Sequence, residues 1–241
     1  MHSIFITGTD TDAGKTYVSR LLLKGLAALN IRALGLKPIA AGVDADGQNA
    51  DAKWLQALSA VPLSYAQVNP VLLQAPVAPH LAAVNEGLHL SFEDLDQLLQ
   101  DTATLDVELR LIEGAGGWLL PLDHQLYFAD WVQQRQLPVV LVVGMKLGCL
   151  NHAMLTAREL QRSGVRVLGW VANSIDPNML LLTENILDLS KRLPWPLLGV
   201  VPYQHPALAQ SEATVQDQVQ VQLGLDLASA LLKQLNSPAG G

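Results

Sequence analysis

The chain has 241 residues, 50% of them hydrophobic and only 15% charged, which fits one large α/β domain with a single core and excludes a disordered chain. Its net charge of -7, without clusters of lysine and arginine, argues against a nucleic-acid surface. The longest apolar runs are too short for a membrane span, and a single cysteine, Cys149, favours a reducing compartment, so we expect a cytoplasmic protein that binds neither nucleic acid nor membrane.

Strand-like and helix-like segments alternate along the chain. This alternation predicts a mostly parallel central sheet with helices on both faces, in a single domain covering residues 1–241. Short β-branched or leucine-rich runs predict strands over residues 3–7, 33–37, 108–112, 139–143, 167–172 and 198–201. Apolar residues at three- and four-residue spacing predict helices over residues 17–29, 50–60, 91–105, 128–136, 151–162 and 180–192.

Two segments do not fit this alternation. Residues 61–86 carry several prolines and little periodicity, and we expect them to form an extended excursion over the sheet edge or the rim of the site. Near the end, residues 215–223 alternate like a strand, whereas residues 226–235 have helical spacing. Residues 237–241 are expected to be a loose tail.

The segment over residues 8–16, GTDTDAGKT, has the features of a phosphate-binding loop. It follows a predicted strand and precedes a predicted helix, as the mechanism requires. Gly14 allows the backbone to approach a phosphate, Lys15 reaches the terminal phosphates, and the Thr16 hydroxyl suits Mg²⁺. Five residues, rather than the usual four, separate Gly8 from the Gly-Lys pair, so Thr9 occupies the position of the first glycine. The sequence therefore predicts a P-loop NTPase-type fold of three layers that binds a nucleotide.

Two charged residues at strand ends are candidates for the chemistry, because ligands of open α/β sheets bind beyond the carboxyl ends of the strands. Lys37 ends the second predicted strand, and Pro38 keeps the chain extended beyond it. Glu113 follows the third strand and precedes a glycine-rich turn, where a carboxylate can hold Mg²⁺. The alternatives are a solvated lysine at a strand end and a turn acid before a flexible loop.

Other polar residues leave two interpretations open. Asp51 begins a predicted helix, and its role as an N-terminal helix acid is physically sufficient alone. The amide of Asn173 suits an adenine edge, but asparagine is also a common turn residue. Asp10 and Asp12 would repel a triphosphate, so they either attract a substrate with ammonium groups or are solvated loop acids.

Taken together, these motifs resemble the dethiobiotin synthetase family from about residue 4 to residue 203. The five-residue spacing of the phosphate-binding loop is also typical of this family. The more specific motifs are those over residues 113–118, EGAGGW, and 146–149, KLGC. Further matches lie at residues 37–40, 68–70, 79–80, 128–132, 150–154, 171–173 and 197–199.

The resemblance implies an ATP- and Mg²⁺-dependent reaction of CO₂ with 7,8-diaminopelargonate that gives dethiobiotin, ADP and phosphate in a homodimer. It implies catalytic roles for Lys15 and Lys37, and metal ligation by Thr16, Asp51 and Glu113. Substrate contacts fall on Thr11, Lys37, Ala41 and Asn151, the last at a helix start contributed by the other subunit. Nucleotide contacts fall on Asp12, Ala13, Gly14, Lys15, Thr16, Tyr17, Asp51, Glu113, Gly114, Ala115, Gly116, Asn173, Ser174, Pro202, Tyr203 and Gln204.

The chain departs from the family pattern at two places. Ala41 stands where family members commonly have a serine whose hydroxyl lies near the carbamate. Losing one such hydrogen bond costs about 1 kcal/mol, which predicts weaker substrate positioning with activity retained. The residues from 204 onwards do not align with the family, so the specificity for the nucleotide base is less well supported than phosphate binding.

A different class shares the same broad fold, namely nucleotide-switched partition or regulatory ATPases. Their mark is an additional lysine early in the phosphate-binding loop, where this chain has Thr9, Asp10 and Thr11. The sequence therefore favours the synthetase over this alternative.

Overall fold

A parallel six-stranded sheet forms the centre of the computed structural model, which describes residues 1–204 and 213–237. The strand order is β2-β5-β1-β6-β7-β8, and every neighbouring pair is parallel. In the register, Phe5 of β1 lies opposite Ile112 of β5 on one side and Val139 of β6 on the other. The strands are β1 (His2–Gly8), β2 (Ala33–Leu36), β5 (Leu109–Glu113), β6 (Val139–Met145), β7 (Val167–Ser174) and β8 (Leu197–Val201).

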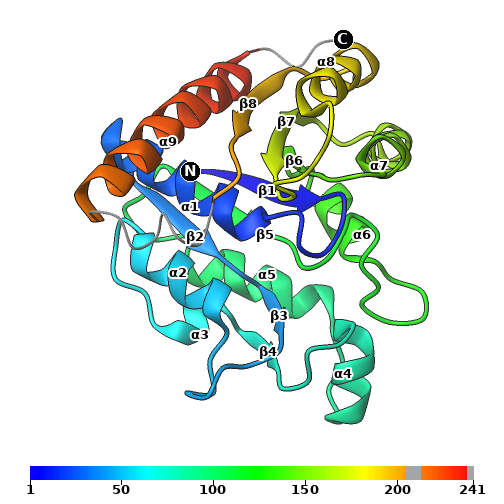
Figure 1. The fold of residues 1–241 in the computed structure, drawn as a ribbon. Coiled ribbons are helices and arrows are strands. Elements are labelled where there is room, and N and C mark those ends of the chain that lie inside the picture. The colour runs from blue at the N-terminus through cyan, green and yellow to red at the C-terminus, as the bar shows by residue number, and fades with distance from the viewer. Residues whose placement is uncertain (205–212, 238–241) are drawn as a thin grey trace.

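Helices cover both faces of this sheet, which confirms the predicted three-layer α/β architecture. α1 and α9 lie together on one side of the sheet, and α6 and α7 lie on the other (Figure 1). The helices of the described residues are α1 (Lys15–Ala28), α2 (Ala50–Leu58), α3 (Tyr65–Val68), α4 (Pro79–Asn85), α5 (Phe92–Asp101), α6 (Phe128–Gln134), α7 (Cys149–Ser163), α8 (Leu182–Arg192) and α9 (Ala213–Asn236).

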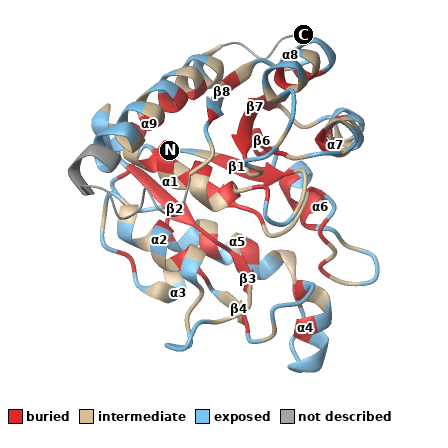
Figure 2. Cartoon of the chain, in the orientation of Figure 1, coloured by how far each residue is buried: buried red, intermediate tan, exposed pale blue. Residues whose placement is uncertain are grey.

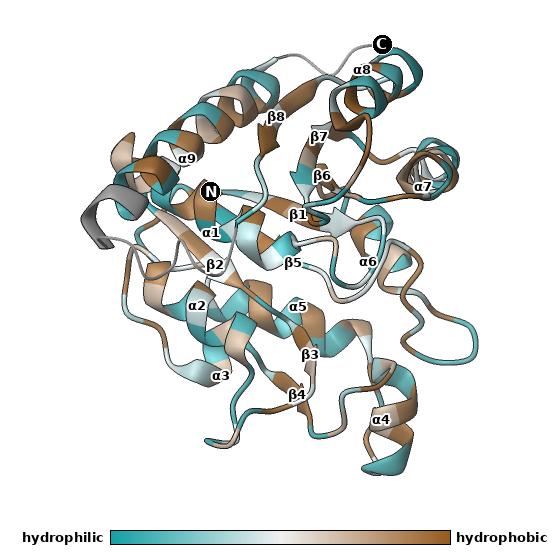
Figure 3. Ribbon diagram, viewed as in Figure 1, coloured by the Kyte–Doolittle hydropathy of each residue, from teal (hydrophilic) through white to brown (hydrophobic). Residues whose placement is uncertain are grey.

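The core lies along the central strands. β6 and β7 are buried over their whole length, as expected for parallel strands covered on both faces (Figure 2). The hydropathy of the chain follows this burial, since the strands are mainly hydrophobic and the outer faces of the helices are hydrophilic (Figure 3). Phe5, Phe128 and Trp131 add a group of aromatic rings against the sheet, with Phe5 and Phe128 edge to face at 5.1 Å. The sheet is therefore a rigid base for the loops at its carboxyl edge.

Residues 215–223, whose sequence alternates like a strand, belong to the continuous helix α9 together with the residues of helical spacing that follow them. Leu223, Leu227 and Leu231 follow at four-residue spacing, and the last two are buried. α9 packs closely against α1, where Gly25 and Gly224 let the two backbones touch. This long-range packing decides the helix, and the alternating sequence does not show it. The last four residues of the predicted tail, 238–241, lie outside the described part of the chain.

Among the described residues, no helix has both the length and the apolar character needed to cross a membrane.

The excursion predicted over residues 61–86 is partly right. It does run along the edge of the molecule, but it contains short regular elements rather than extended chain alone: α3, α4 and the strand β4 (Val71–Leu73). β4 pairs in parallel with β3 (Ile39–Ala41), which follows directly from β2 (Figure 1). This small second sheet continues the chain beyond Lys37 and forms one wall of the candidate site.

Candidate active site

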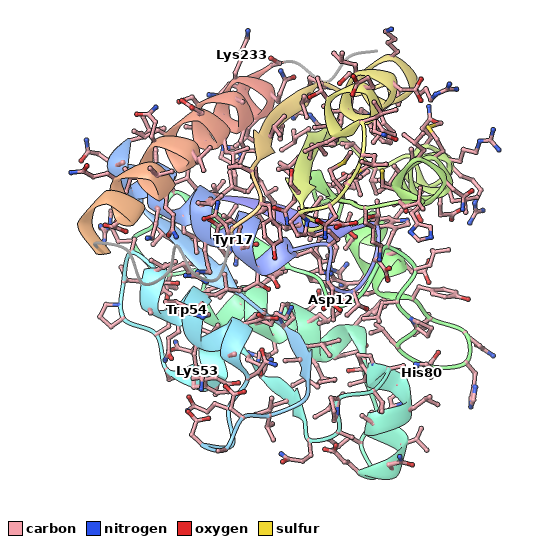
Figure 4. All side chains as sticks on the ribbon, in the orientation of Figure 1. Asp12, Tyr17, Lys53, Trp54, His80 and Lys233 are labelled. Carbon is pink, nitrogen blue, oxygen red and sulfur yellow. The ribbon has the colours of Figure 1, made fainter. Side chains whose placement is uncertain are left out.

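A cavity of about 830 Å³ opens at the carboxyl edge of the sheet, where the ends of β1, β2 and β5 meet α2 and the excursion. Its lining includes residues of the P-loop and of the segment that leads into α4; Figure 4 labels Asp12 of that loop and His80, the second residue of α4. The cavity brings together these residues predicted from the sequence: Thr11, Asp12, Gly14, Lys15, Thr16, Lys37, Ala41, Asp51, Glu113, Ala115 and Gly116.

The phosphate-binding loop adopts the strand–loop–helix form that its sequence predicts. Gly14 has a φ of 85°, a left-handed conformation that favours glycine, and it is the residue before α1. A Cβ at this position would collide with the side-chain amide of Asn173. Asn173 Nδ2 donates to the carbonyl of Ala13 over 2.9 Å, so the end of β7 holds the loop from behind. The loop is therefore fixed by β7 as well as by its own helix.

Lys15 lies across the mouth of the loop. Its Nζ donates to the carbonyls of Asp10 over 3.0 Å and Gly116 over 2.6 Å. Burial is the main cause that lowers the pKa of Lys15 to about 8; the nearby charge of Lys37 acts in the same direction, and Glu113, Asp51 and Asp10 act against it. The site therefore concentrates positive charge where it is poorly solvated, which favours binding of an anion.

Lys37, Glu113 and Asp51 form one cluster with Thr16, at the end of the loop. Lys37 Nζ lies 2.7 Å from Glu113 Oε1 and 3.6 Å from Asp51 Oδ2. The Thr16 hydroxyl donates to the same Glu113 oxygen over 2.6 Å. Burial opposes the charge of Lys37, but Glu113 and Asp51 more than offset it, so the pKa of Lys37 is raised. The cluster therefore holds a buried ammonium group that stays charged at neutral pH.

The same cluster has the donor set for a hard divalent cation. Glu113 is fully buried, and its Oε2 has no hydrogen-bond partner among the described residues. Thr16 supplies a hydroxyl oxygen, and Asp51, half-exposed, supplies a second carboxylate from the first turn of α2. Oxygen ligands of this kind are what Mg²⁺ prefers. The residues present therefore fit Mg²⁺.

The two acids of the loop have different surroundings. Asp12 lines the cavity. Asp10 instead pairs with Lys146, whose Nζ lies 3.1 Å from Asp10 Oδ2, and it also accepts a hydrogen bond from the backbone of Thr11. Lys146 is the main reason that the pKa of Asp10 is lowered. Only Asp12 of this pair is thus placed to face a ligand in the cavity.

Some predicted residues lie outside the cavity. Asn173, Ser174 and Tyr17 are behind or beside the phosphate-binding loop, where the hydroxyls of Ser174 and Tyr17 are buried without a hydrogen-bond partner in the described structure. Asn151 is exposed in the first turn of α7. Gly114 follows Glu113 and accepts a hydrogen bond from Lys37 through its carbonyl. Ala13, whose carbonyl accepts from Asn173, is buried within the loop. The remaining predicted residues, Pro202, Tyr203 and Gln204, follow β8 at the same edge of the sheet.

Other cavity residues were not singled out from the sequence as site residues. Asn49 caps α2, and an asparagine directly before a predicted helix was a usable signal for this position. Residues 76–79 lie in the proline-rich excursion, so its predicted place at the rim is confirmed. Ala40 and residues 119–121 had no signal, because apolar and turn residues line cavities without a distinctive pattern.

Comparisons of sequence agree on one family. A family model described as an AAA domain matches residues 2–211. The ATP-dependent dethiobiotin synthetase BioD of Pseudoalteromonas translucida is 46% identical over 206 residues, which cover 84% of this chain and 91% of that protein. The protein of the same name from Cellvibrio japonicus is 48% identical over 203 residues, covering 83% and 89%.

Comparisons of structure give more distant relatives. A chain of the MinC:MinD cell division protein complex of Aquifex aeolicus superposes with a TM-score of 0.60 at 15% identity, covering 97% of this chain and 96% of that one. The septum site-determining protein MinD of Pyrococcus horikoshii, complexed with Mg-ADP, gives 0.57 at 18% identity, covering 97% and 98%. At such identities the likeness shows the fold alone.

Proposed function

The chain belongs to the AAA-domain family and, within it, to the ATP-dependent dethiobiotin synthetases, and from this premise we propose the reaction that its cavity carries out. The proposed substrates are ATP, CO₂ and 7,8-diaminopelargonate, and the products are dethiobiotin, ADP and phosphate. The observation that supports this most directly is the position of Lys37. Its buried ammonium group lies against Glu113 and Asp51, in the same cavity as the phosphate-binding loop.

The proposed reaction has three steps. One amine of the substrate adds to CO₂ and loses a proton, which gives a carbamate. A carbamate oxygen then attacks the γ-phosphorus of ATP, and the bond from that phosphorus to ADP breaks. Finally the second amine attacks the carbamate carbon, phosphate leaves, and the ureido ring closes. Every nucleophile belongs to the substrate, so the protein's task is to position groups and stabilise charge.

The side chains of the cavity suit these tasks. Lys15 stabilises the charge on the transferring phosphoryl group, in place of the two carbonyls it contacts in this structure. Lys37 stabilises the carbamate and the phosphoryl group from the opposite side. Thr16, Asp51 and Glu113 would hold Mg²⁺, which neutralises phosphate charge when it is bound. Thr11 and Ala41, which line the same cavity, contact the diamine.

The ends of the substrates extend beyond the cavity in this proposal. The adenine lies towards Asn173 and the turn from Pro202 to Gln204, at the carboxyl ends of β7 and β8. The substrate carboxylate is received by Asn151 and the start of α7 of a second subunit, because a helix N-terminus is a favourable site for an anion. The proposed enzyme is therefore a homodimer, and the exposure of Asn151 in one chain supports that arrangement.

The proposed function is tested by detecting its product. The protein is incubated with MgATP, bicarbonate and 7,8-diaminopelargonate, and dethiobiotin is sought by mass spectrometry. We expect one ADP per dethiobiotin and little ATP hydrolysis without the diamine. Absence of product, with hydrolysis that does not depend on the diamine, contradicts the proposal.

A variant tests the assignment of Lys37. Lys37→Ala should abolish product and leave ATP binding largely intact, because Lys15 and the loop backbone bind the phosphates. The melting temperature is measured in parallel, since the change leaves Glu113 buried without its ion-pair partner. A folded variant that no longer binds ATP would move Lys37 from catalysis to nucleotide binding.

A further inference from the structure

Two side chains beyond the cavity, Tyr65 and Asn69, connect Lys37 to the helix that carries Asp51. The backbone N–H of Asn49 donates to the Tyr65 hydroxyl over 2.8 Å. That hydroxyl donates to Asn69 Oδ1 over 3.0 Å, and Asn69 Nδ2 donates to the carbonyl of Lys37 over 2.7 Å. We call the chain of hydrogen bonds through Asn49, Tyr65 and Asn69 the relay.

The hydrogen-bond donor and the acceptor are fixed at each step of the relay. Asn69 Nδ2 also donates to the carbonyl of Val71 over 3.0 Å, so the amide nitrogen faces two acceptors and Oδ1 must accept. The one hydroxyl hydrogen of Tyr65 is therefore directed at Asn69, and its oxygen accepts from Asn49. Asn69 is only 2% exposed, so water does not compete for these bonds. A satisfied network of this kind holds its members in one arrangement.

The N-terminal end of α2 is the part that needs such a support. The middle of the helix packs tightly on β2, where a Cβ at Gly35 would lie 2.9 Å from Leu55 Cβ. Its first turn is instead reached through a loop whose residues 44–47 are exposed. Asn49 caps the helix and donates to the carbonyl of Gly42 over 3.0 Å, which fixes the cap to the same loop. The relay is the connection from this cap to the backbone of Lys37.

We infer that Tyr65 and Asn69 are positioning residues for the proposed ring-closing reaction, on which this inference rests. By fixing the backbone of Lys37 and the cap of α2, they set the separation between the Lys37 ammonium and the Asp51 carboxylate, 3.6 Å here. The phosphate-binding loop is held separately, by Asn173 and α1. Weakening the relay therefore lowers the rate of the chemical steps and leaves the affinity for ATP unchanged.

Tyr65→Phe tests the relay by removing one oxygen while the ring keeps its packing. We expect kcat to fall about fivefold, the loss that one weakened hydrogen bond produces, with the KM for ATP unchanged. A second measurement does not depend on turnover. Acetylation of Lys37 by acetic anhydride, followed by mass spectrometry with the exposed Lys191 as internal reference, should become several-fold faster as its ion pairs loosen.

Ser64→Ala is the matched control, at the N-cap of the same short helix. Ser64 is exposed and caps α3 together with Gln67, so its loss weakens the helix without removing a member of the relay. Its kcat and its Lys37 labelling should match the unmodified protein. The inference is overturned if Tyr65→Phe leaves kcat or the labelling unchanged, or if Ser64→Ala alters both equally. An unmodified protein that makes no dethiobiotin contradicts the proposed function, whereas the labelling still decides whether the relay holds Lys37.

Discussion

Lys15 and Lys37 are both buried lysines in one cavity, but their surroundings move their pKa values in opposite directions. Lys37 lies against two carboxylates, and its pKa is raised. Among the described residues, the Lys15 ammonium group donates hydrogen bonds to neutral carbonyl oxygens only, and burial is the main cause that lowers its pKa to about 8. The two cations therefore respond differently to pH, with Lys37 charged throughout the range in which Lys15 titrates.

The lowered pKa of Lys15 predicts a pH-dependent affinity for ATP. Above pH 8 the free protein loses the Lys15 proton, and a triphosphate must bind together with a proton. We expect the dissociation constant of a non-hydrolysable ATP analogue, measured by calorimetry from pH 7 to 9.5, to rise by up to about tenfold per pH unit above 8. In Lys15→Arg the guanidinium stays charged, so this slope should disappear.

The same titration should not unfold the protein. Since the folded-state pKa of Lys15 lies below 10.5, the ordinary pKa of a lysine, the unfolded chain binds more protons between pH 8 and 10.5. The unfavourable contribution of Lys15 to the free energy of unfolding is fully present below pH 8 and is relieved as the pH rises through this window.

The affinity measurement also has an outcome that contradicts the assignment. If the dissociation constant of the ATP analogue does not change across pH 8, Lys15 is not the group that binds the phosphates.

Ala41 is a second position where a single hydroxyl group is expected to change substrate binding. It ends β3 and lines the cavity, at the position where the family resemblance implies a serine hydroxyl. Ala41→Ser should lower the KM for 7,8-diaminopelargonate about fivefold, the effect of about 1 kcal/mol from one hydrogen bond, with the KM for ATP unchanged. Ala78→Ser adds a hydroxyl elsewhere in the same cavity and should change neither constant. An unchanged diamine KM in Ala41→Ser would mean that the carbamate does not lie at the end of β3.

At the scale of elements, the residues predicted from the sequence were those at strand ends. Lys37 and Glu113 were found because parallel strands bring their carboxyl ends to one edge, where motif and geometry coincide. The relay through Tyr65 and Asn69 could not be predicted, since its hydrogen bonds depend on how the excursion folds back on β2. The ion pair between Asp10 and Lys146 could not be predicted either, because 136 residues separate the two in the sequence.

The contact between α1 and α9 at Gly25 and Gly224 is another feature that the sequence does not predict. It allows a test in which the structure and helix propensity predict opposite changes in the free energy of unfolding. Gly224 lies in the interior of α9, where helix propensity alone predicts that alanine stabilises by about 1 kcal/mol. The structure predicts the opposite, because a Cβ at Gly224 would collide with the carbonyl of Leu21 and approach the backbone nitrogen of Gly25 to 2.9 Å. We expect Gly224→Ala to lower the free energy of unfolding in urea by about 1–3 kcal/mol.

The control for this change lies on the exposed face of α9. Gln218→Ala is also in the helix, and an exposed substitution of this kind should stay within about 0.5 kcal/mol of the unmodified protein. Stabilisation by Gly224→Ala would mean that the two helices are further apart than the structure shows, and that propensity rather than packing decides this segment.

At the scale of the whole molecule, the sheet was predicted almost completely from its own sequence pattern, whereas the homodimer was predicted only from the family resemblance and stays a prediction. Buried strands such as β6 have nearly continuous apolar sequences, so residues 139–143 identified the strand without any knowledge of its neighbours. A surface that meets a second copy has no such periodicity. In this chain, the proposed dimer rests on family resemblance and on the exposure of residues near the start of α7.

Leu147 is the exposed residue that best tests the dimer. It lies in the turn before α7, close in sequence to Asn151, and it is 95% exposed in one chain. If this turn packs on a second subunit, Leu147→Asp places a charge in the interface of both copies and should weaken dimerisation by at least about tenfold. Sedimentation velocity over a range of concentrations measures this, and the KM for the diamine should rise as the partner's α7 is lost from each site.

Val219→Asp is the matched control for that experiment. Val219 is half-exposed on α9, which lies on the opposite side of the sheet from α7 (Figure 1). The variant carries the same new charge and should sediment like the unmodified protein, with an unchanged KM for the diamine. A dimer that is unaffected by Leu147→Asp would place the interface elsewhere, and the substrate carboxylate would then have to be bound by residues of its own subunit rather than by Asn151 of the partner subunit.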